Sequence, residues 1–230
     1  MSIAENHGGM YRNLKLLRET NGQAECNLFK AMGLAYVYVD KGNDIAALIE
    51  TFKKVKDSKT PVVVHINTLK GKGYAPAEQN KEAWHYCAPF DIETGKSLFV
   101  PTGEDYSSVT RDYLLEKMKK DPRVVAITSA TPTVMGFTED KRKEAGSQFI
   151  DVGIAEETAV AVASGIAANG GKPVYGVYST FVQRTFDQIS QDLCINNNPA
   201  TIVTFWGSVY GMNDVTHLGL QDIPMLSNIP

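Results

Sequence analysis

The stretch FIDVGIAEETAVAVASGIAANGGKPVYGVY, residues 149–178, decides the fold. Its first four residues favour a strand, and the apolar spacing from Ala155 to Ala168 is typical of a helix. That helix is expected to end at Asn169-Gly170-Gly171, before a second strand from Pro173 to Tyr178. A strand, a helix and a strand in this order predict a βαβ unit with parallel strands.

The same alternation continues on both sides of this unit. Just before this unit we expect a helix at 107–120 and a strand at 124–128, and after it a helix at 180–195 and a strand at 200–205. Nearer the N-terminus, we expect helices at 24–34 and 44–55 and strands at 35–39 and 61–66. The sequence therefore predicts an α/β protein built from parallel sheets.

Residues 68–102 show no periodicity and are rich in glycine and proline. A structureless connection of that length is unusual inside one compact domain, so it favours an interdomain linker. We therefore expect two α/β pieces, 1–67 and 106–230, joined by a long linker at 68–105.

Composition excludes several classes of function. The net charge of −3 indicates neither a nucleic-acid partner nor a membrane partner. The sequence contains no run of about 18 apolar residues, so it predicts no transmembrane helix. Met1–Asn6 lacks the features of a signal peptide. The three cysteines, Cys26, Cys87 and Cys194, are far apart, which fits a reducing compartment. We expect a cytoplasmic protein.

In open parallel sheets, ligands bind beyond the carboxyl ends of the strands. That rule selects the loops after Val152, Tyr178 and Phe205, all rich in polar or aromatic groups. The first loop leads into Glu156 and Glu157. Two acids at a helix start can be catalytic, or they can simply be favoured by the positive end of the helix dipole.

The other two loops contain an arginine and a histidine. Arg184 could bind a phosphate with its planar fork, or form a surface ion pair with Asp187 or Asp192. His217 could move a proton at neutral pH, or be an ordinary solvated side chain. In the linker, His85 is a second proton-transfer candidate, and none of these signals alone names a reaction.

Taken in order, these segments resemble the 1-deoxyxylulose-5-phosphate synthase family of transketolase-like thiamine-diphosphate enzymes. The resemblance covers nearly the whole chain, including Met1–Asn6, Asp40–Asp44, the loop Lys70–Glu78 and His85–Asp91, and is strongest from Asp151 to Gln188. It implies a thiamine-diphosphate-binding α/β fold and a transferase. In the family the reaction joins a two-carbon unit from pyruvate to glyceraldehyde 3-phosphate.

The resemblance also implies roles for single residues. Glu156 matches the glutamate that hydrogen-bonds N1′ of the cofactor's aminopyrimidine, and His85 and His217 match active-site histidines. Four further residues are expected at the cofactor or beside it: Phe181, which matches the aromatic on the pyrimidine ring, Tyr178, Ser2 and Ile3. The expected substrate-binding residues are Arg184, which matches an acceptor-phosphate ligand, Tyr74 and Lys72.

Several positions depart from the family pattern. Glu157-Thr158 stand where Gln-His is usual, and Trp206 stands where a second phosphate-binding arginine is expected. An aspartate is expected near Asn213, and Asn43 replaces the histidine of an Asp-Gly-His-Asp stretch. Loss of one arginine weakens a phosphate clamp, which opens the alternative of a transketolase-like enzyme with another acceptor.

The family's diphosphate and magnesium motif is not present in these residues. We therefore expect a part truncated at both ends: 1–67 as the C-terminal part of the diphosphate-binding domain and 106–230 as an incomplete pyrimidine-binding domain. Thiamine diphosphate and Mg²⁺ are the cofactors that the resemblance implies, with a keto acid or sugar phosphate as substrate and a homodimer as the complete enzyme. No residue of this chain is assigned to the metal. A non-catalytic fragment or partner subunit remains the alternative.

Overall fold

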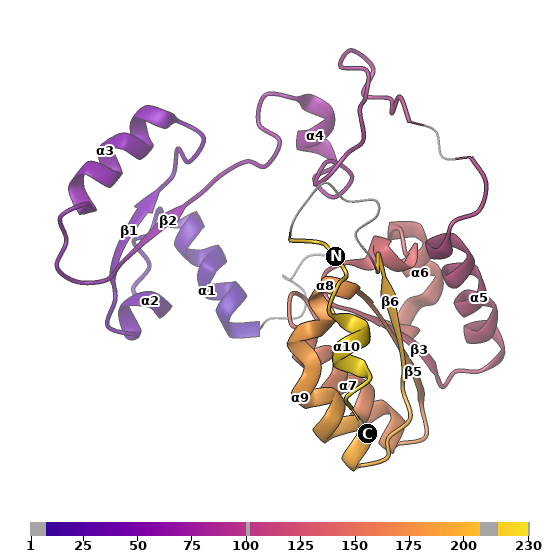
Figure 1. The fold of residues 1–230 in the computed structure, drawn as a ribbon. Helices are drawn as coiled ribbons and strands as arrows, with labels where there is room; N and C mark the ends of the chain where they lie inside the picture. Colours follow the sequence, from indigo (N-terminus) through magenta and orange to yellow (C-terminus); the bar gives the residue numbers. More distant parts are fainter. Residues whose placement is uncertain (1–7, 100–101, 208–215, 230) are drawn as a thin grey trace. The chain divides into compact units, whose positions relative to one another are not determined.

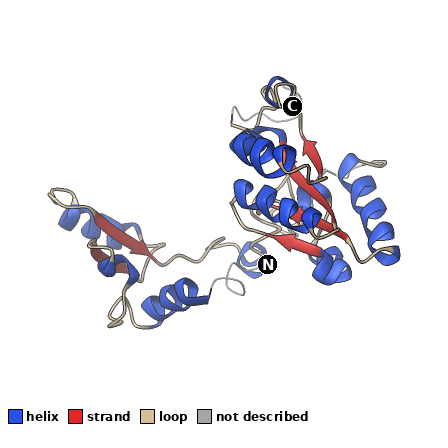
Figure 2. Ribbon diagram, turned by 90° about the horizontal axis from the view of Figure 1, so that it is seen from below, coloured by secondary structure: helices blue, strands red, loops and turns tan. Residues whose placement is uncertain are grey.

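A computed structural model describes residues 8–99, 102–207 and 216–229 (Figure 1). The chain separates into two compact units, Met1–Thr102 and Gly103–Pro230. Figure 2 distinguishes the helices from the strands within each unit. No helix in the described ranges is long and apolar enough to cross a bilayer.

The first unit contains a two-stranded parallel sheet. Its elements are α1 (Gly8–Glu19), α2 (Leu28–Ala31), β1 (Ala35–Val39), α3 (Ile45–Val55), β2 (Val62–Ile66) and α4 (Ala75–Gln79). The register runs from Ala35 opposite Val62 to Val39 opposite Ile66. Helix α3 begins where Asp44 accepts hydrogen bonds from the N–H groups of the second and third helical residues, the usual way to satisfy a helix N-terminus.

The helix expected at 24–34 is wrong over most of its length. Only the single turn α2 forms, because Asn13 of α1 bonds to the carbonyl of Cys26 and to the N–H of Leu28. These contacts hold the preceding segment out of a helix. Helix α1 and helix α4, the latter inside the expected linker, were not predicted.

The second unit is a four-stranded parallel sheet in the order β4-β3-β5-β6. Its strands are β3 (Val124–Thr128), β4 (Phe149–Asp151), β5 (Lys172–Tyr178) and β6 (Thr201–Phe205). Its α-helices are α5 (Tyr106–Lys120), α6 (Glu139–Ala145), α7 (Glu156–Ala168), α8 (Ser179–Val182), α9 (Phe186–Gln188) and α10 (Asp222–Leu226). The 3₁₀ turns η2 (Pro132–Met135), η3 (Gly146–Gln148) and η4 (Gln183–Thr185), and the π-helical η5 (Ile189–Ile195), complete it.

Helices cover both faces of this sheet (Figure 1). One core joins α5 and η2 to the sheet and includes Leu114, Met135 and Phe149. The other joins α7 and η5 to the opposite face and includes Val160 and Tyr175. The predicted α/β class with parallel strands is thus confirmed, and apolar burial on both faces explains the near-continuous hydrophobic strands.

The helix expected at 180–195 is broken into α8, η4, α9 and η5. Within this segment the Thr185 hydroxyl donates to the carbonyl of Val182 at 2.6 Å, which supports a tight turn. The break places Arg184 on η4 rather than on a continuous α-helix.

The carboxyl ends of all four strands lie at one edge of the sheet. Thr128 is opposite both Asp151 and Gly176, and Tyr178 is opposite Phe205. The prediction that the loops after β4, β5 and β6 share one edge is therefore confirmed.

Candidate active site

A tight connection between β4 and α7 positions Glu156. One oxygen of Asp151 accepts hydrogen bonds from the N–H groups of Ala130 and Gly153, each at 2.9 Å. Gly153 has φ +79°, a conformation that glycine adopts without strain. The chain therefore turns sharply, and α7 begins at Glu156, which is only 3% exposed.

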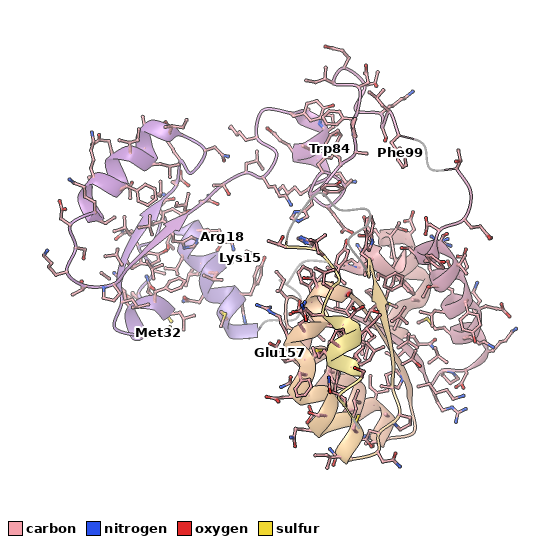
Figure 3. The ribbon with its side chains drawn as sticks, in the orientation of Figure 1. Lys15, Arg18, Met32, Trp84, Phe99 and Glu157 are labelled. Atoms are coloured by element: carbon pink, nitrogen blue, oxygen red, sulfur yellow. The ribbon has the colours of Figure 1, made fainter. Side chains whose placement is uncertain are left out.

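Glu156 and Arg184 form an ion pair between α7 and η4. Arg184 Nη1 lies 3.1 Å from Glu156 Oε2, and the arginine side chain is 56% exposed. The structure therefore brings together the predicted catalytic acid and the predicted phosphate ligand. Arg184 is paired with Glu156 rather than with Asp187 or Asp192, the partners considered from sequence. Glu157, one residue along, is exposed (Figure 3).

Four rings gather at the same edge of the sheet. The Tyr178 and Phe181 ring centroids are 5.5 Å apart, and His217 lies 5.9 Å and 5.2 Å from them, in edge-to-face geometry. Trp206 lies 6.5 Å from Tyr178. We call Tyr178, Phe181, Trp206 and His217 the aromatic wall. Three of the sequence-predicted site residues are thus neighbours, because β5, α8 and the segment after β6 meet at this edge.

A close backbone contact holds His217 in the aromatic wall. Gly207 forms a parallel bridge with Gly219. A Cβ atom on Gly219 would lie 2.5 Å from Ser179 Oγ and 2.7 Å from Gly207 Cα. Only glycine fits there, and sequence reasoning missed it, because the crowding comes from residues distant in the chain. Among the described residues, the buried Ser179 hydroxyl has no hydrogen-bond partner.

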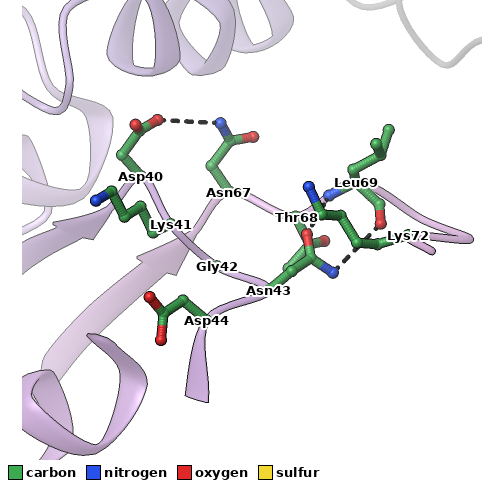
Figure 4. Close-up of a pocket in the computed structure, with 9 residues that line it drawn as sticks. All are labelled: Asp40, Lys41, Gly42, Asn43, Asp44, Asn67, Thr68, Leu69 and Lys72. Carbon is green, nitrogen blue, oxygen red and sulfur yellow. Dashed lines mark hydrogen bonds between the residues drawn. The ribbon is translucent and has the colours of Figure 1, made fainter. Parts of the chain in front are cut away.

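The first unit has its own pocket, of about 560 Å³, at the carboxyl ends of β1 and β2 (Figure 4). Lys72 lines it. Asn43 accepts a hydrogen bond from the N–H of Leu69 at 2.7 Å and donates to its carbonyl at 3.3 Å. The Asn43 amide thus anchors the start of the loop that contains Lys72.

Two other predicted residues of the first unit, Tyr74 and His85, follow Lys72 along the chain. Lys70 Nζ lies 2.6 Å from His85 Nδ1. The Tyr74 hydroxyl donates to the carbonyl of Ile92 at 3.0 Å, and its ring packs against Trp84. Ser2, Ile3 and Asn213 lie outside the described residues.

The second unit fits the aminopyrimidine part of thiamine diphosphate. It has a buried carboxylate at a helix start, next to a guanidinium, and the aromatic wall lies at the same edge of the sheet. For Mg²⁺, by contrast, the described ranges contain no group of three His, Cys, Asp or Glu side chains that could hold a metal ion.

In comparisons with known proteins, the two units of the chain match two different family models. Residues 103–230 match the family model "Transketolase, pyrimidine binding domain", and residues 3–68 match "1-deoxy-D-xylulose-5-phosphate synthase". The chain is 41% identical over 204 residues to 1-deoxy-D-xylulose-5-phosphate synthase 1 of Geobacter sulfurreducens, covering 88% of this chain and 32% of that protein. It is 39% identical over 232 residues to the synthase of a Synechococcus species, covering 100% and 35%.

The chain thus spans about a third of the length of the curated relatives it matches. Among solved structures, a Pichia stipitis transketolase in complex with sedoheptulose 7-phosphate is 15% identical, with a TM-score of 0.48. That alignment covers 92% of this chain and 44% of the transketolase.

Proposed function

Because the chain belongs to the 1-deoxy-D-xylulose-5-phosphate synthase family, with a transketolase pyrimidine-binding domain at 103–230, we propose that its protein is a thiamine-diphosphate-dependent transferase. The proposed reaction moves a two-carbon unit from pyruvate or a ketose to an aldehyde or sugar phosphate. The observation that carries the proposal is the buried carboxylate of Glu156, which opens α7 at the sheet edge that holds the aromatic wall.

The proposed roles in the second unit follow from this arrangement. Thiamine diphosphate, when bound, supplies the electron sink for carbon–carbon chemistry. Glu156 would hold and move a proton at its carboxylate, in the role that the resemblance gives the glutamate at the aminopyrimidine. Phe181 and Tyr178 would hold that ring and exclude water from it, and His217 would exchange a proton with the substrate. Arg184 is the candidate ligand for an acceptor phosphate.

The first unit supplies further proposed contacts. Lys72 and Tyr74 border the substrate, and His85 is a second proton-transfer group that the Lys70 amine contacts. Ser2 and Ile3 are proposed cofactor contacts on the resemblance alone. A homodimer, a cytoplasmic location and Mg²⁺ belong to the same proposal. Family membership supports the homodimer and the metal, and the three free cysteines are consistent with a reducing compartment.

The donor half-reaction tests this function without knowledge of the acceptor. Purified holoenzyme that contains this chain is given pyruvate, thiamine diphosphate and Mg²⁺, and CO₂ release is measured. Cofactor-dependent release that Glu156→Gln abolishes supports the proposal. No release from pyruvate, together with no two-carbon transfer from a ketose phosphate, contradicts it.

A further inference from the structure

Two hydroxyl groups are buried together on the α7 face of the second sheet. The side chains of Ser129 and Tyr175 are 2% and 0% exposed, and their hydroxyl oxygens lie 2.9 Å apart. The Tyr175 ring packs in the apolar cluster that includes Ile127 and Val160. A phenylalanine would fill the same space without a group that needs a hydrogen bond, so packing alone does not explain the tyrosine.

The register of the sheet shows which way the Tyr175 side chain leans. Tyr175 is opposite Ile127 of β3, and Ser129 comes two residues later, just beyond the end of that strand at Thr128. Since the Tyr175 hydroxyl reaches Ser129, the side chain leans along the strand toward the carboxyl edge of the sheet. The helix packed on this face is α7, which begins with Glu156 at the same edge. The hydroxyl pair and Glu156 therefore share one face and one edge of the sheet.

The hydroxyl pair lies within reach of the charge of Glu156. Burial is the main cause that raises the pKa of Tyr175, the hydrogen bond with Ser129 opposes it, and the charges of Glu156 and Glu157 raise it further. A hydrogen bond between two hydroxyls uses only one of their two hydrogens, and the other can rotate toward a negative charge. A carboxylate that is 3% exposed is stabilised by such a dipole, because little water is present to screen it.

The same pair helps to fix the turn that leads to Glu156. Ser129 precedes Ala130, whose φ of +60° is unusual for a residue with a side chain. The Ala130 N–H donates to the Asp151 carboxylate, which also accepts a hydrogen bond from the N–H of Gly153. A strained conformation of this kind persists only where neighbouring contacts hold it. Ser129 and Asp151 supply such contacts, and α7 begins with Glu156 soon after Gly153.

We propose that Tyr175 and Ser129 are positioning residues for Glu156. Their hydroxyl pair holds the end of β3 and presents a dipole to the Glu156 carboxylate, so that the carboxylate is kept in the orientation that proton transfer requires. Both residues act through Glu156, since neither side chain is exposed to a ligand. The inference rests on the proposed function, in which Glu156 is the proton-transfer group of the second unit.

The test separates positioning from packing. Holoenzyme is assayed for exchange of the C2 proton of thiamine diphosphate, and for Tm, in the wild type, Tyr175→Phe, Ser129→Ala and the double variant. Each single variant leaves one buried hydroxyl without its partner, so it should lose Tm and exchange about five- to tenfold more slowly, the effect of about one hydrogen bond. The double variant leaves no unpaired hydroxyl, so it should regain much of the lost Tm and yet exchange as slowly as the single variants.

Ser164→Ala is the matched control. Ser164 lies two turns farther along α7 than Glu156, and its buried hydroxyl donates to the carbonyl of Asp192. Its loss should lower Tm but leave exchange at the wild-type rate. Single variants that exchange at the wild-type rate overturn the proposal. A double variant that recovers both Tm and exchange also overturns it, because the pair would then act on stability alone.

A measurement without cofactor distinguishes this inference from the proposed function. Thermal unfolding of the 230-residue chain is compared for Tyr175→Phe, Glu156→Gln and the two changes together. Tyr175→Phe should lower Tm less in the glutamine background than in the wild type, because the charge that the hydroxyl pair stabilises is already gone. Equal losses of Tm in the two backgrounds overturn the inference. Absence of C2 exchange in wild-type holoenzyme would instead count against the proposed function, and the unfolding comparison would still decide the inference.

Discussion

Replacement of Glu156 by glutamine separates a catalytic carboxylate from a helix-start acid. The glutamine has the same size, and its amide oxygen can still accept a hydrogen bond from Arg184 at the position of Oε2. It cannot take up and release a proton in the accessible pH range. A positioned proton-transfer group contributes about 10²–10⁴-fold to rate, which corresponds to about 3–5 kcal/mol. We therefore expect Glu156→Gln to lose nearly all turnover.

The same change should cost little stability. The guanidinium still donates a hydrogen bond, now to a neutral amide oxygen instead of a carboxylate, a difference of about 1 kcal/mol. The exposure of the Arg184 side chain screens the pair and reduces that figure. A neutral amide also costs less to bury than a charged carboxylate, which further reduces the loss of stability. The variant should stay folded while it loses activity.

Glu157→Gln is the matched control, because this neighbour lies on the same helix start but is exposed. Its loss should cost a few tenths of a kcal/mol through the helix dipole and leave the chemistry intact. The assay is exchange of the C2 proton of thiamine diphosphate in holoenzyme, followed by NMR in D₂O. Equal exchange rates in the two glutamine variants would refute the catalytic assignment of Glu156.

Three other predictions concern packing, pH and cofactor affinity. Gly219→Ala should destabilise the second unit by about 1–3 kcal/mol through overpacking, and it should raise the reactivity of His217 toward an acylating reagent. The control is Gly165→Ala, whose added methyl group meets no atom within 4 Å and should have neither effect. Equal effects of the two variants in thermal unfolding and in labelling would contradict the prediction. Burial, and then the charge of Arg18, lower the pKa of His65, so the unfolded chain binds its proton more readily. Stability of the first unit should therefore fall as pH drops below about 6.5, and urea unfolding of His65→Phe should show a weaker pH dependence; an unchanged dependence would count against it. Calorimetry with these 230 residues and Mg²⁺ should show weak or no binding of thiamine diphosphate. The family's diphosphate motif is not present in these residues, and the contacts that it would make are strong because they are charge-assisted. Micromolar, magnesium-dependent affinity would contradict that expectation.

Local patterns in the sequence were enough to predict the sheets. The strands at 35–39 and 124–128 match β1 and β3 in full, because continuous apolar, β-branched runs are rarely compatible with anything but a buried strand. The starts of α3 and α5 are equally local, since Asp44 and Asp105 each cap a helix through residues two or three positions away. Parallel order then placed the loops after β4, β5 and β6 at one edge, where the resemblance also put Glu156.

Long-range packing decided the rest. The Glu156–Arg184 ion pair joins residues 28 positions apart, and it depends on the break of the 180–195 segment into short turns. The crowding around Gly219 comes from Ser179 and Gly207, which no periodicity connects to it. A sequence pattern reports which face of an element is apolar, but the partner of a buried charge depends on where other elements end in space. That is why the candidate residues could be chosen from the sequence, whereas their pairing required the tertiary structure.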